Sequence, residues 1–200
     1  MRQHSIQLSI KRCIDILFSL VLLVLLLPVF SILSILIRLG SRGGAFYRQT
    51  RVGRNGRLFT VVKFRTMAVD AESKGPVWSI RDDPRVTPLG GVLRRTGMDE
   101  LPQLWNILMG DMSLVGPRPE RPVFAARFER EVPRYGQRHA MRPGITGWAQ
   151  VHGFRGDTSI SERTRYDVEY VRNWSLLLDL RILLRTPFIL EFRNRTRGEN

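Results

Sequence analysis

An uncharged apolar run from Ile16 to Ile37 constrains this chain more than any other part of its sequence. The run has 22 residues, and only four of them are not strongly apolar, namely Ser19, Pro28, Ser31 and Ser34. A straight helix of this length would reach roughly 33 Å, about the thickness of the hydrocarbon core of a bilayer. The apolar core of a cleaved signal peptide is shorter, about 7–15 residues, and ends at a small-x-small site. The run therefore predicts a membrane segment within residues 1–40, followed by one domain in residues 41–200.

Basic residues flank both ends of this run. Lys11 and Arg12 precede it, and four arginines follow it, namely Arg38, Arg42, Arg48 and Arg51. Because Lys and Arg beside a membrane segment are retained on the cytoplasmic face, both ends are predicted to lie there. Pro28 removes a helical N–H near the middle of the run and clashes with the preceding turn, which favours a bend. Proline also occurs in ordinary membrane-spanning helices, so on the residues alone a span and a re-entrant helix are equally favoured.

The charge of the chain predicts an anionic partner. The formal net charge is +14, and only three of the 32 basic residues are lysines, namely Lys11, Lys63 and Lys74. Arginine grips phosphate oxygens in pairs, so anionic lipid, nucleic acid and phosphorylated small molecules all qualify, although an arginine-favouring codon usage explains the surface residues equally well. No helix-turn-helix pattern, zinc-ligand spacing or aromatic RNA-binding strand supports nucleic acid. The single Cys13 cannot form an internal disulfide and is expected to face lipid.

Two adjacent carboxylates, Asp99 and Glu100, precede a segment with helical periodicity. The apolar residues Leu101, Leu104, Trp105 and Leu108 share one helix face, and Gly110 is a suitable C-terminal stop. Asp99 is thus expected near the N-cap, where backbone N–H groups and the helix dipole favour an ionised carboxylate and attract anions. An ionised Asp beside a phosphate site can act as a nucleophile. Acids that only cap a helix are common, so these residues alone favour the capping role.

Other segments predict a mainly helical α+β fold. A short hairpin is expected around Asn55-Gly56, a type I′ turn signal, followed by the β-rich segment 58–64. Residues 89–95 precede the central helix, and 123–141 are expected to form a further helix. Residues 174–190 carry too many charges to span a membrane and fit either a helix in the headgroup plane or a core helix. Between these helices, the prolines on both sides of Arg118 form a rigid turn that fixes its direction.

Five ordered motifs together resemble one family. They are Lys63-Phe64-Arg65-Thr66-Met67, Asp99-Glu100-Leu101-Pro102-Gln103, Gly110-Asp111-Met112-Ser113, Gly116-Pro117-Arg118-Pro119 and the segment from Arg142 to Gln150. They resemble the bacterial monotopic polyprenyl-phosphate phosphoglycosyl transferases, over about residues 11–186. The resemblance implies a re-entrant N-terminal helix and a small cytoplasmic catalytic domain with interfacial amphipathic helices. The residues alone favour a membrane span and a re-entrant helix equally. The resemblance favours a re-entrant segment bent at Pro28.

The resemblance also implies a two-step transfer and a role for each matching residue. Asp99 would attack the β-phosphate of a UDP-sugar and release UMP, and a polyprenyl phosphate would then take the phosphosugar. Glu100 matches the second acid of the pair and is expected to help hold Mg²⁺ near the diphosphate with Asp99. The remaining matches are basic residues of a phosphate pocket, namely Arg94, Arg118, Lys63 and Arg155. A carboxylate nucleophile, one divalent cation and forked arginines suffice for phosphoryl transfer, and Mg²⁺ needs no protein cage.

The resemblance implies a UDP-sugar and undecaprenyl phosphate, or another polyprenyl phosphate, as substrates, and membrane lipids as surroundings. A second copy of the chain is a further candidate partner. Nucleic acid is not expected as a partner. The expected location is the cytoplasmic face of the inner membrane, at the start of exopolysaccharide or O-antigen assembly. The patch from Arg155 to Thr158 looks more like the hexose-1-phosphate (glucose or galactose) transferases than the diacetamido-sugar ones. Two rival hypotheses remain, an aspartyl-phosphate phosphatase or phosphotransferase with the same pair of acids, and a basic membrane anchor without activity.

Overall fold

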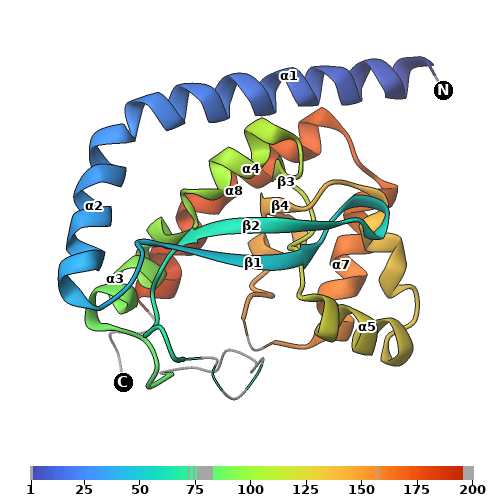
Figure 1. Ribbon diagram of the computed structural model, residues 1–200. Coiled ribbons are helices and arrows are strands. Elements are labelled where there is room, and N and C mark those ends of the chain that lie inside the picture. The colour runs from blue at the N-terminus through green and yellow to red at the C-terminus, as the bar shows by residue number, and fades with distance from the viewer. Residues whose placement is uncertain (1, 72, 74, 76–82, 157, 196–200) are drawn as a thin grey trace.

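The computed structural model describes residues 2–71, 73, 75, 83–156 and 158–195, with side chains described between residues 6 and 187 (Figure 1). Its elements are, in chain order, α1 (Arg2–Leu25), α2 (Leu27–Gly40), β1 (Phe46–Val52), η1 (Arg54–Gly56), β2 (Leu58–Phe64), α3 (Pro88–Thr96), η2 (Met98–Glu100), α4 (Gln103–Met109), β3 (Ser113–Val115), α5 (Pro122–Glu131), η3 (Tyr135–Ala140), β4 (Gly144–Thr146), α6 (Trp148–Val151), α7 (Ile160–Arg172) and α8 (Leu176–Arg195). The described chain is mainly helical and has two two-stranded sheets, which confirms the predicted α+β class.

The long apolar run forms two helices, α1 and α2, that meet at a bend of 61°. The helix breaks at Leu26, and Pro28 occupies the first turn of α2. The predicted bend is therefore present but begins before the proline, because its ring clashes with the preceding turn and its missing N–H is tolerated at a helix start. In the described part of the chain no single helix is long and apolar enough to cross a membrane. The bent pair from Ile6 to Gly40 meets that length and composition criterion only when both helices are counted.

Helix α1 buries polar side chains in the middle of its inward face, between Leu8 and Leu22, which pack against the core, and it exposes other apolar side chains. Lys11, Asp15 and Ser19 lie one turn apart and are buried, and the residue exposure of Ser19 is 0%. Leu17 and Leu25 on other faces are each 66% exposed. A water-soluble surface helix has the opposite pattern, with an apolar stripe towards the core. Cys13 is exposed on α1, and its contact with lipid stays a prediction.

The predicted hairpin is present as antiparallel strands β1 and β2. Asn55 (φ 55°) and Gly56 (φ 77°) both have positive φ, as the turn signal required, although the connection is longer than a two-residue turn and contains η1. Phe64 at the end of β2 is buried and stacks on Phe46, with ring centroids 5.3 Å apart. This packing holds the end of β2, where Lys63 precedes Phe64, against α2 and α3.

The central helix is shorter than predicted. Asp99 and Glu100 lie in the 3₁₀ turn η2, and α4 begins only at Gln103, so Asp99 does not cap that helix. Gly110 ends α4 with φ 96°, as expected. The predicted apolar face is only partly buried: Leu104 lies in the core, whereas Trp105 is 53% exposed. Proline at position 102 lacks an N–H, and the chain turns around it before the regular helix can start.

Behind α4 the short strands β3 and β4 pair in parallel, which the sequence did not predict. Glycines permit this close pairing, since a Cβ on Gly144 would lie 2.1 Å from the backbone nitrogen of Gly116. The single helix predicted for residues 123–141 is wrong. Helix α5 ends at Glu131 and the turn η3 follows, because Pro133 and the positive φ of Arg134 (65°) interrupt the helix.

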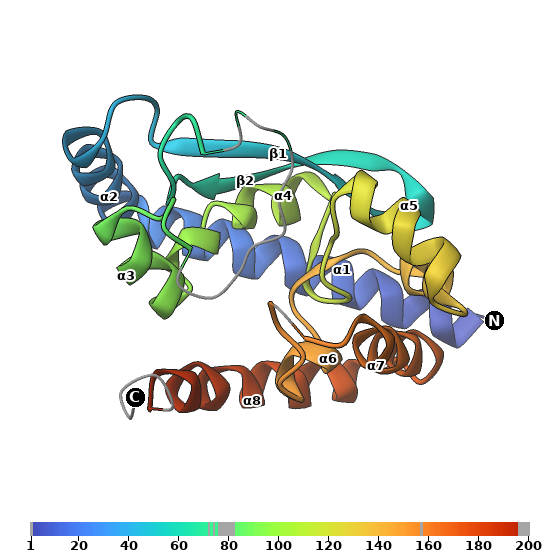
Figure 2. The same ribbon diagram turned by 90° about the horizontal axis from the view of Figure 1, so that it is seen from below.

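The C-terminal helix α8 runs in the same direction as α1 (Figure 2). Its inner face buries Asp179 and Ile182, while Leu177, Leu180 and Leu184 are exposed. The buried face agrees with the predicted core helix, whereas the alternative of a helix in the headgroup plane stays a prediction. Ile182 belongs to the largest core cluster, together with Leu104, Ile107 and Met112 from α4 and the segment after it.

Candidate active site

The two acids stand at the junction between α3 and α4. Gly97 ends α3 with φ 75°, a left-handed conformation that allows the chain to turn directly into η2. This turn places Asp99 and Glu100 beside the end of β2 and the segment after β3. Strands and helices from distant parts of the chain thus supply the basic residues that surround the acids.

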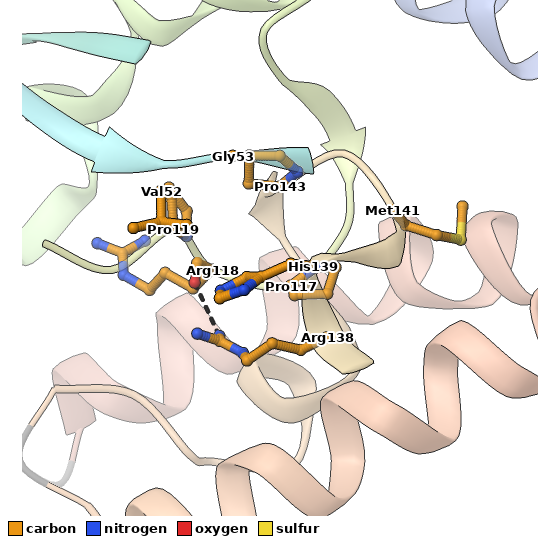
Figure 3. A pocket seen from close by; sticks show the side chains of 9 residues that line it. All are labelled: Val52, Gly53, Pro117, Arg118, Pro119, Arg138, His139, Met141 and Pro143. Atoms are coloured by element: carbon orange, nitrogen blue, oxygen red, sulfur yellow. Dashed lines mark hydrogen bonds between the residues drawn. The ribbon is translucent and has the colours of Figure 1, made fainter. Parts of the chain in front are cut away.

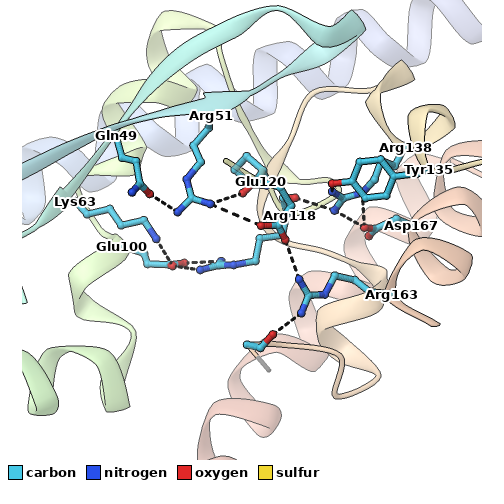
Figure 4. Close-up of polar contacts among 12 residues, drawn as sticks. Gln49, Arg51, Lys63, Glu100, Arg118, Glu120, Tyr135, Arg138, Arg163 and Asp167 are labelled. Carbon is cyan, nitrogen blue, oxygen red and sulfur yellow. Dashed lines mark hydrogen bonds and ion pairs between the residues drawn. The ribbon is translucent and has the colours of Figure 1, made fainter. Parts of the chain in front are cut away.

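Glu100 is held by two basic side chains (Figure 4). Lys63 Nζ lies 2.8 Å from Glu100 Oε1, and Arg118 donates from Nη1 to Oε2 at 3.0 Å and from Nη2 to Oε1. Burial acts to raise the pKa of Glu100, but Arg118 and Lys63 outweigh it and hold this pKa well below its usual range. Glu100 is therefore ionised and fixed by a bidentate contact.

Asp99 has a different environment from its neighbour. Among the residues that the structure describes, no hydrogen bond or ion pair engages its carboxylate. Burial, followed by the charge of Glu100, raises the pKa of Asp99 to about 6, against the attraction of Lys63, Arg118 and Arg94. This corrects the expectation that the helix dipole favours its ionised form, because desolvation and a like charge outweigh the dipole. Two adjacent carboxyls whose pKa values are pushed apart in this way are typical of sites with divided chemical roles.

Arg94 approaches the acids from α3. Its Nε donates to Thr66 Oγ1 at 2.8 Å, which anchors the guanidinium to the segment after β2. Burial lowers the pKa of Arg94, and the charge of Asp99 acts in the opposite direction. Lys63 is affected similarly, since burial lowers its pKa and Glu100 opposes this effect. Four of the predicted pocket and acid residues, Lys63, Arg94, Asp99 and Glu100, thus interact at one place, together with Arg118.

A buried network of charges supports Arg118 from behind, and the sequence did not predict it. Arg138 Nη2 donates to the carbonyl oxygen of Arg118 at 2.8 Å, and the same guanidinium lies 2.6 Å from Asp167 Oδ2. Glu120, two residues after Arg118, accepts from Arg163 Nη1 at 2.8 Å and lies 3.8 Å from Arg51 Nη1. Buried charges of this kind are usually paired, but their partners are far apart in sequence, so no local pattern signals them.

Arg155 lies in the loop between α6 and α7. Arg163 steadies that loop, because its Nη2 donates to the carbonyl oxygen of Gly156 at 2.6 Å. The assigned role of Arg155 in the phosphate pocket stays a prediction. Arg163 contacts both this loop and Glu120, so it connects the loop to the segment that carries Arg118.

A small pocket lies on the other side of the Arg118 backbone (Figure 3). Its lining includes Pro117, Pro119, His139 and Met141, and the Arg118 side chain points away from them. Burial and Arg138 lower the pKa of His139 to about 4, so this imidazole is neutral near pH 7. Arg118 itself belongs to the lining of this pocket, whereas Asp99 and Glu100 do not.

The residues present are compatible with Mg²⁺. Glu100 Oε2 accepts one of the hydrogen bonds described above and keeps a lone pair, and the Asp99 carboxylate is not engaged by the described residues. The described chain contains no group of three or more His, Cys, Asp and Glu side chains able to hold a metal. Mg²⁺ is commonly held by one or two carboxylates plus phosphate oxygens and water, so this donor set fits it.

Comparison with known proteins places the chain in a family. The model of the bacterial sugar transferase family matches residues 6–193. The chain is 42% identical over 183 residues to the UDP-glucose:undecaprenyl-phosphate glucose-1-phosphate transferase of Escherichia coli (strain K12), covering 90% of this chain and 39% of that protein. It is 44% identical over 179 residues to the UDP-N-acetylgalactosamine-undecaprenyl-phosphate N-acetylgalactosaminephosphotransferase of Aeromonas hydrophila, covering 88% and 42%.

A further relative is similar to the chain over nearly its whole length. The exopolysaccharide production protein PSS of Rhizobium leguminosarum bv. phaseoli is 44% identical over 187 residues, which are 90% of this chain and 94% of that protein. The chain spans about two fifths of the length of the Escherichia coli and Aeromonas hydrophila relatives. On the match of residues 6–193, this chain belongs to the bacterial sugar transferase family.

Proposed function

We propose that this chain transfers a sugar-1-phosphate from a UDP-sugar to undecaprenyl phosphate or a similar polyprenyl phosphate. The observation that carries this proposal is the difference between the two acids. Glu100 is held by Arg118 and Lys63, whereas Asp99 is not engaged by described residues and has a pKa of about 6. The names of the family relatives support the same donor and acceptor.

The chemistry divides into two displacements at one phosphorus. An Asp99 carboxylate oxygen attacks the β-phosphorus of the UDP-sugar, the bond from this phosphorus to the bridging oxygen breaks, and UMP leaves with that oxygen. A phosphate oxygen of the polyprenyl phosphate then attacks the same phosphorus and displaces Asp99. The product is a polyprenyl diphosphosugar, and the carboxylate is regenerated.

The basic residues would act by positioning and charge neutralisation. Arg118 fixes Glu100 with a planar fork, and Lys63 and Arg94 add positive charge beside Asp99. We propose that Glu100, and Asp99 beside it, hold Mg²⁺ together with oxygens of the diphosphate. When bound, this ion would neutralise charge on the diphosphate as UMP leaves.

We expect a panel of UDP-sugars to identify the donor. The protein, polyprenyl phosphate and Mg²⁺ would be mixed with UDP-glucose, UDP-galactose or UDP-N-acetylgalactosamine, and UMP release followed. One sugar should be strongly preferred, and we propose a hexose, glucose or galactose. A strong preference for N-acetylgalactosamine would contradict the hexose assignment but not the transferase activity.

The same assay separates the transferase from its rivals. A phosphatase with these two acids would form the same products with or without polyprenyl phosphate, whereas a transferase should yield a lipid-linked phosphosugar only with it. A basic membrane anchor would release no UMP from any donor. Its binding would weaken steeply with salt and would be indifferent to Asp99→Asn.

We infer that the bent pair α1 and α2 is a re-entrant membrane segment on the cytoplasmic face of the inner membrane. The outward apolar face of α1, the buried polar face and the 61° bend support this arrangement. The exposed leucines of α8 and the exposed Trp105 of α4 are suited to the interface. The site would then meet a soluble donor and a lipid phosphate at one surface, at the start of polysaccharide assembly. Two statements about partners stay predictions, namely that a second copy of the chain can bind and that nucleic acid does not.

The membrane arrangement can be tested with single cysteines. In a Cys13→Ser background, His4→Cys should resist an impermeant thiol reagent added to intact cells, because both ends of the segment lie inside. Pro28→Leu should straighten the helix and expose residue 4 in part of the molecules, since Lys11 and Arg12 oppose translocation. Labelling from outside with Pro28 unchanged would contradict the re-entrant arrangement.

A further inference from the structure

The buried polar side chains of α1 contact two parts of the candidate site rather than lipid or solvent. Lys11 Nζ donates to the carbonyl oxygen of Val115 at 3.0 Å and lies 2.6 Å from Asp179 Oδ2. Asp15 Oδ1 accepts from the backbone N–H of Leu114 at 3.0 Å and from Ser113 Oγ at 3.1 Å. All three residues of β3 are thus held by two side chains that lie one turn apart on α1.

From β3 the chain reaches Arg118 in three residues with little freedom. Gly116 N donates to the carbonyl oxygen of Thr146 at 2.9 Å, and Gly144 N donates to that of Pro117 at 3.0 Å. A Cβ on Gly116 would lie 2.2 Å from the carbonyl oxygen of Arg142, so this segment packs closely against the backbone at Arg142. The position of β3 therefore sets the position of Arg118.

Arg12 holds the other side of the site through α4. Its Nη1 and Nη2 donate to the carbonyl oxygens of Ile107 and Leu108 at 2.6 and 2.8 Å. These carbonyls lie in the last turn of α4, where a helix has unpaired acceptors and a cation is favourable. Because α4 has only seven residues and follows Glu100 closely, its far end is two turns from the acids.

We propose that Lys11, Arg12 and Asp15 are positioning residues, which fix Arg118 relative to Glu100 by holding β3 and the end of α4 against the same helix. This proposal rests on the proposed function for its catalytic consequence. The positive-inside effect explains a basic Lys11 and Arg12 but not an acidic Asp15. Asp15 therefore separates positioning from membrane topology.

The test compares Asp15→Ala, Asp15→Asn and Ser19→Ala in the full chain. Alanine removes the acceptor for Leu114 and Ser113, whereas asparagine keeps an acceptor oxygen. Ser19 is the matched control, because it is buried on the same face but bonds only to Asp15 and Ile16 carbonyls of its own helix. None of these changes removes a basic residue from the N-terminal region, and acidic residues contribute little to the positive-inside effect.

We expect Asp15→Ala to slow the UMP burst with UDP-sugar alone by about 10-fold or more, because a displacement of about 1 Å at a reacting group can cost 10²-fold. The burst amplitude, which counts active molecules, should stay unchanged. Asp15→Asn and Ser19→Ala should behave as the unmodified chain. A reduced amplitude with a normal rate would overturn the proposal, since it would mean that Asp15 only stabilises the fold.

A second pair of variants covers a failure of Asp15→Ala to fold. Lys11→Met leaves Asp179 buried without its cation, and adding Asp179→Asn removes that charge but does not restore the bond to Val115. Lys11→Met should lower thermal stability and slow the UMP burst, and the double variant should regain the stability but keep the slow burst. Recovery of both would overturn a positioning role for the Val115 contact.

Hydrogen exchange gives a readout that does not need activity. Asp15→Ala should increase amide exchange from Leu114 through Arg118, whereas Ser19→Ala should not. An increase confined to Leu114 would overturn the proposal. If exchange spreads to Arg118 but the unmodified protein releases no UMP from any UDP-sugar, the positioning role stands and the proposed function fails.

Discussion

Asp99→Asn is expected to abolish the covalent phosphosugar and to lower UMP release by about 10⁴-fold or more, because removal of a nucleophile eliminates the first displacement. Intact-mass measurement after mixing with UDP-sugar alone should show one phosphosugar on the unmodified chain and none on the variant. If UMP appears only after the lipid acceptor is added, the mechanism is a direct displacement and Asp99 is not the nucleophile.

The unfolding temperature of Asp99→Asn provides the control for its loss of activity. In the folded state the pKa of Asp99 is about 6, above its ordinary value of 3.8, so folding binds protons between about pH 4 and 6. The stability contributed by this group is therefore lost as pH rises through that window. Asparagine carries no charge, so the variant should unfold at the same or a higher temperature at pH 7. A lower unfolding temperature would point to a structural defect.

The pH profile of the first step should report the same group. Only the ionised carboxylate attacks phosphorus, so the rate constant of the UMP burst, measured at low UDP-sugar and divided by the UDP-sugar concentration, should rise with pH and level off above an apparent pKa near 6. Glu100 does not titrate in this range, because its pKa is held well below the usual value. The measurement should omit the lipid acceptor, since a phosphate monoester itself titrates near pH 6. A flat profile between pH 5 and 7 would contradict the assignment.

Arg118→Lys is expected to slow the first step by about 10²-fold or more, the loss typical of one electrostatic donor in a transition state. Lysine keeps the charge but can no longer contact both Oε1 and Oε2 of Glu100. Arg118→Ala should cost more, because among the described residues Glu100 would then be held by Lys63 alone.

A surface arginine supplies the matched control for Arg118. Arg127 forms an exposed pair with Glu131 one turn along α5, and Arg127→Lys should leave turnover unchanged. Both variants would be followed by rapid mixing with UDP-sugar alone, so that the first rate constant is measured directly. A near-normal rate for Arg118→Lys would reduce Arg118 to a structural residue of its turn.

Local sequence patterns found much of the fold. The apolar run with Pro28 predicted a bent helical segment, and Asn55-Gly56 predicted the hairpin with its positive φ values. These features depend on neighbouring residues, through a missing N–H or a left-handed turn, so the sequence alone determines them. The predictions failed where a local interruption was overlooked, as at Pro133 and Arg134.

The candidate site was found differently. Lys63, Asp99, Glu100 and Arg118 lie in the ordered motifs, Arg94 was named by the family resemblance, and the structure brings these five together. The sequence specifies which residues are present, but it does not specify which side chains surround each of them in the fold. Whether Asp99 or Glu100 is paired, and which of them has the raised pKa, could not be read from two adjacent acids.

The sequence by itself identified an uncharged segment long enough for a membrane, placed a helix-breaking proline within it, and predicted an anionic partner from the strongly basic charge. Only the tertiary structure decided which residues of α1 are buried, among them the polar side chains Lys11, Asp15 and Ser19. It also decided the separate states of Asp99 and Glu100 and the contacts of Lys11 and Asp15 with β3. The physical reason is that desolvation and charge pairing depend on distances between residues that folding brings together from far apart in the chain.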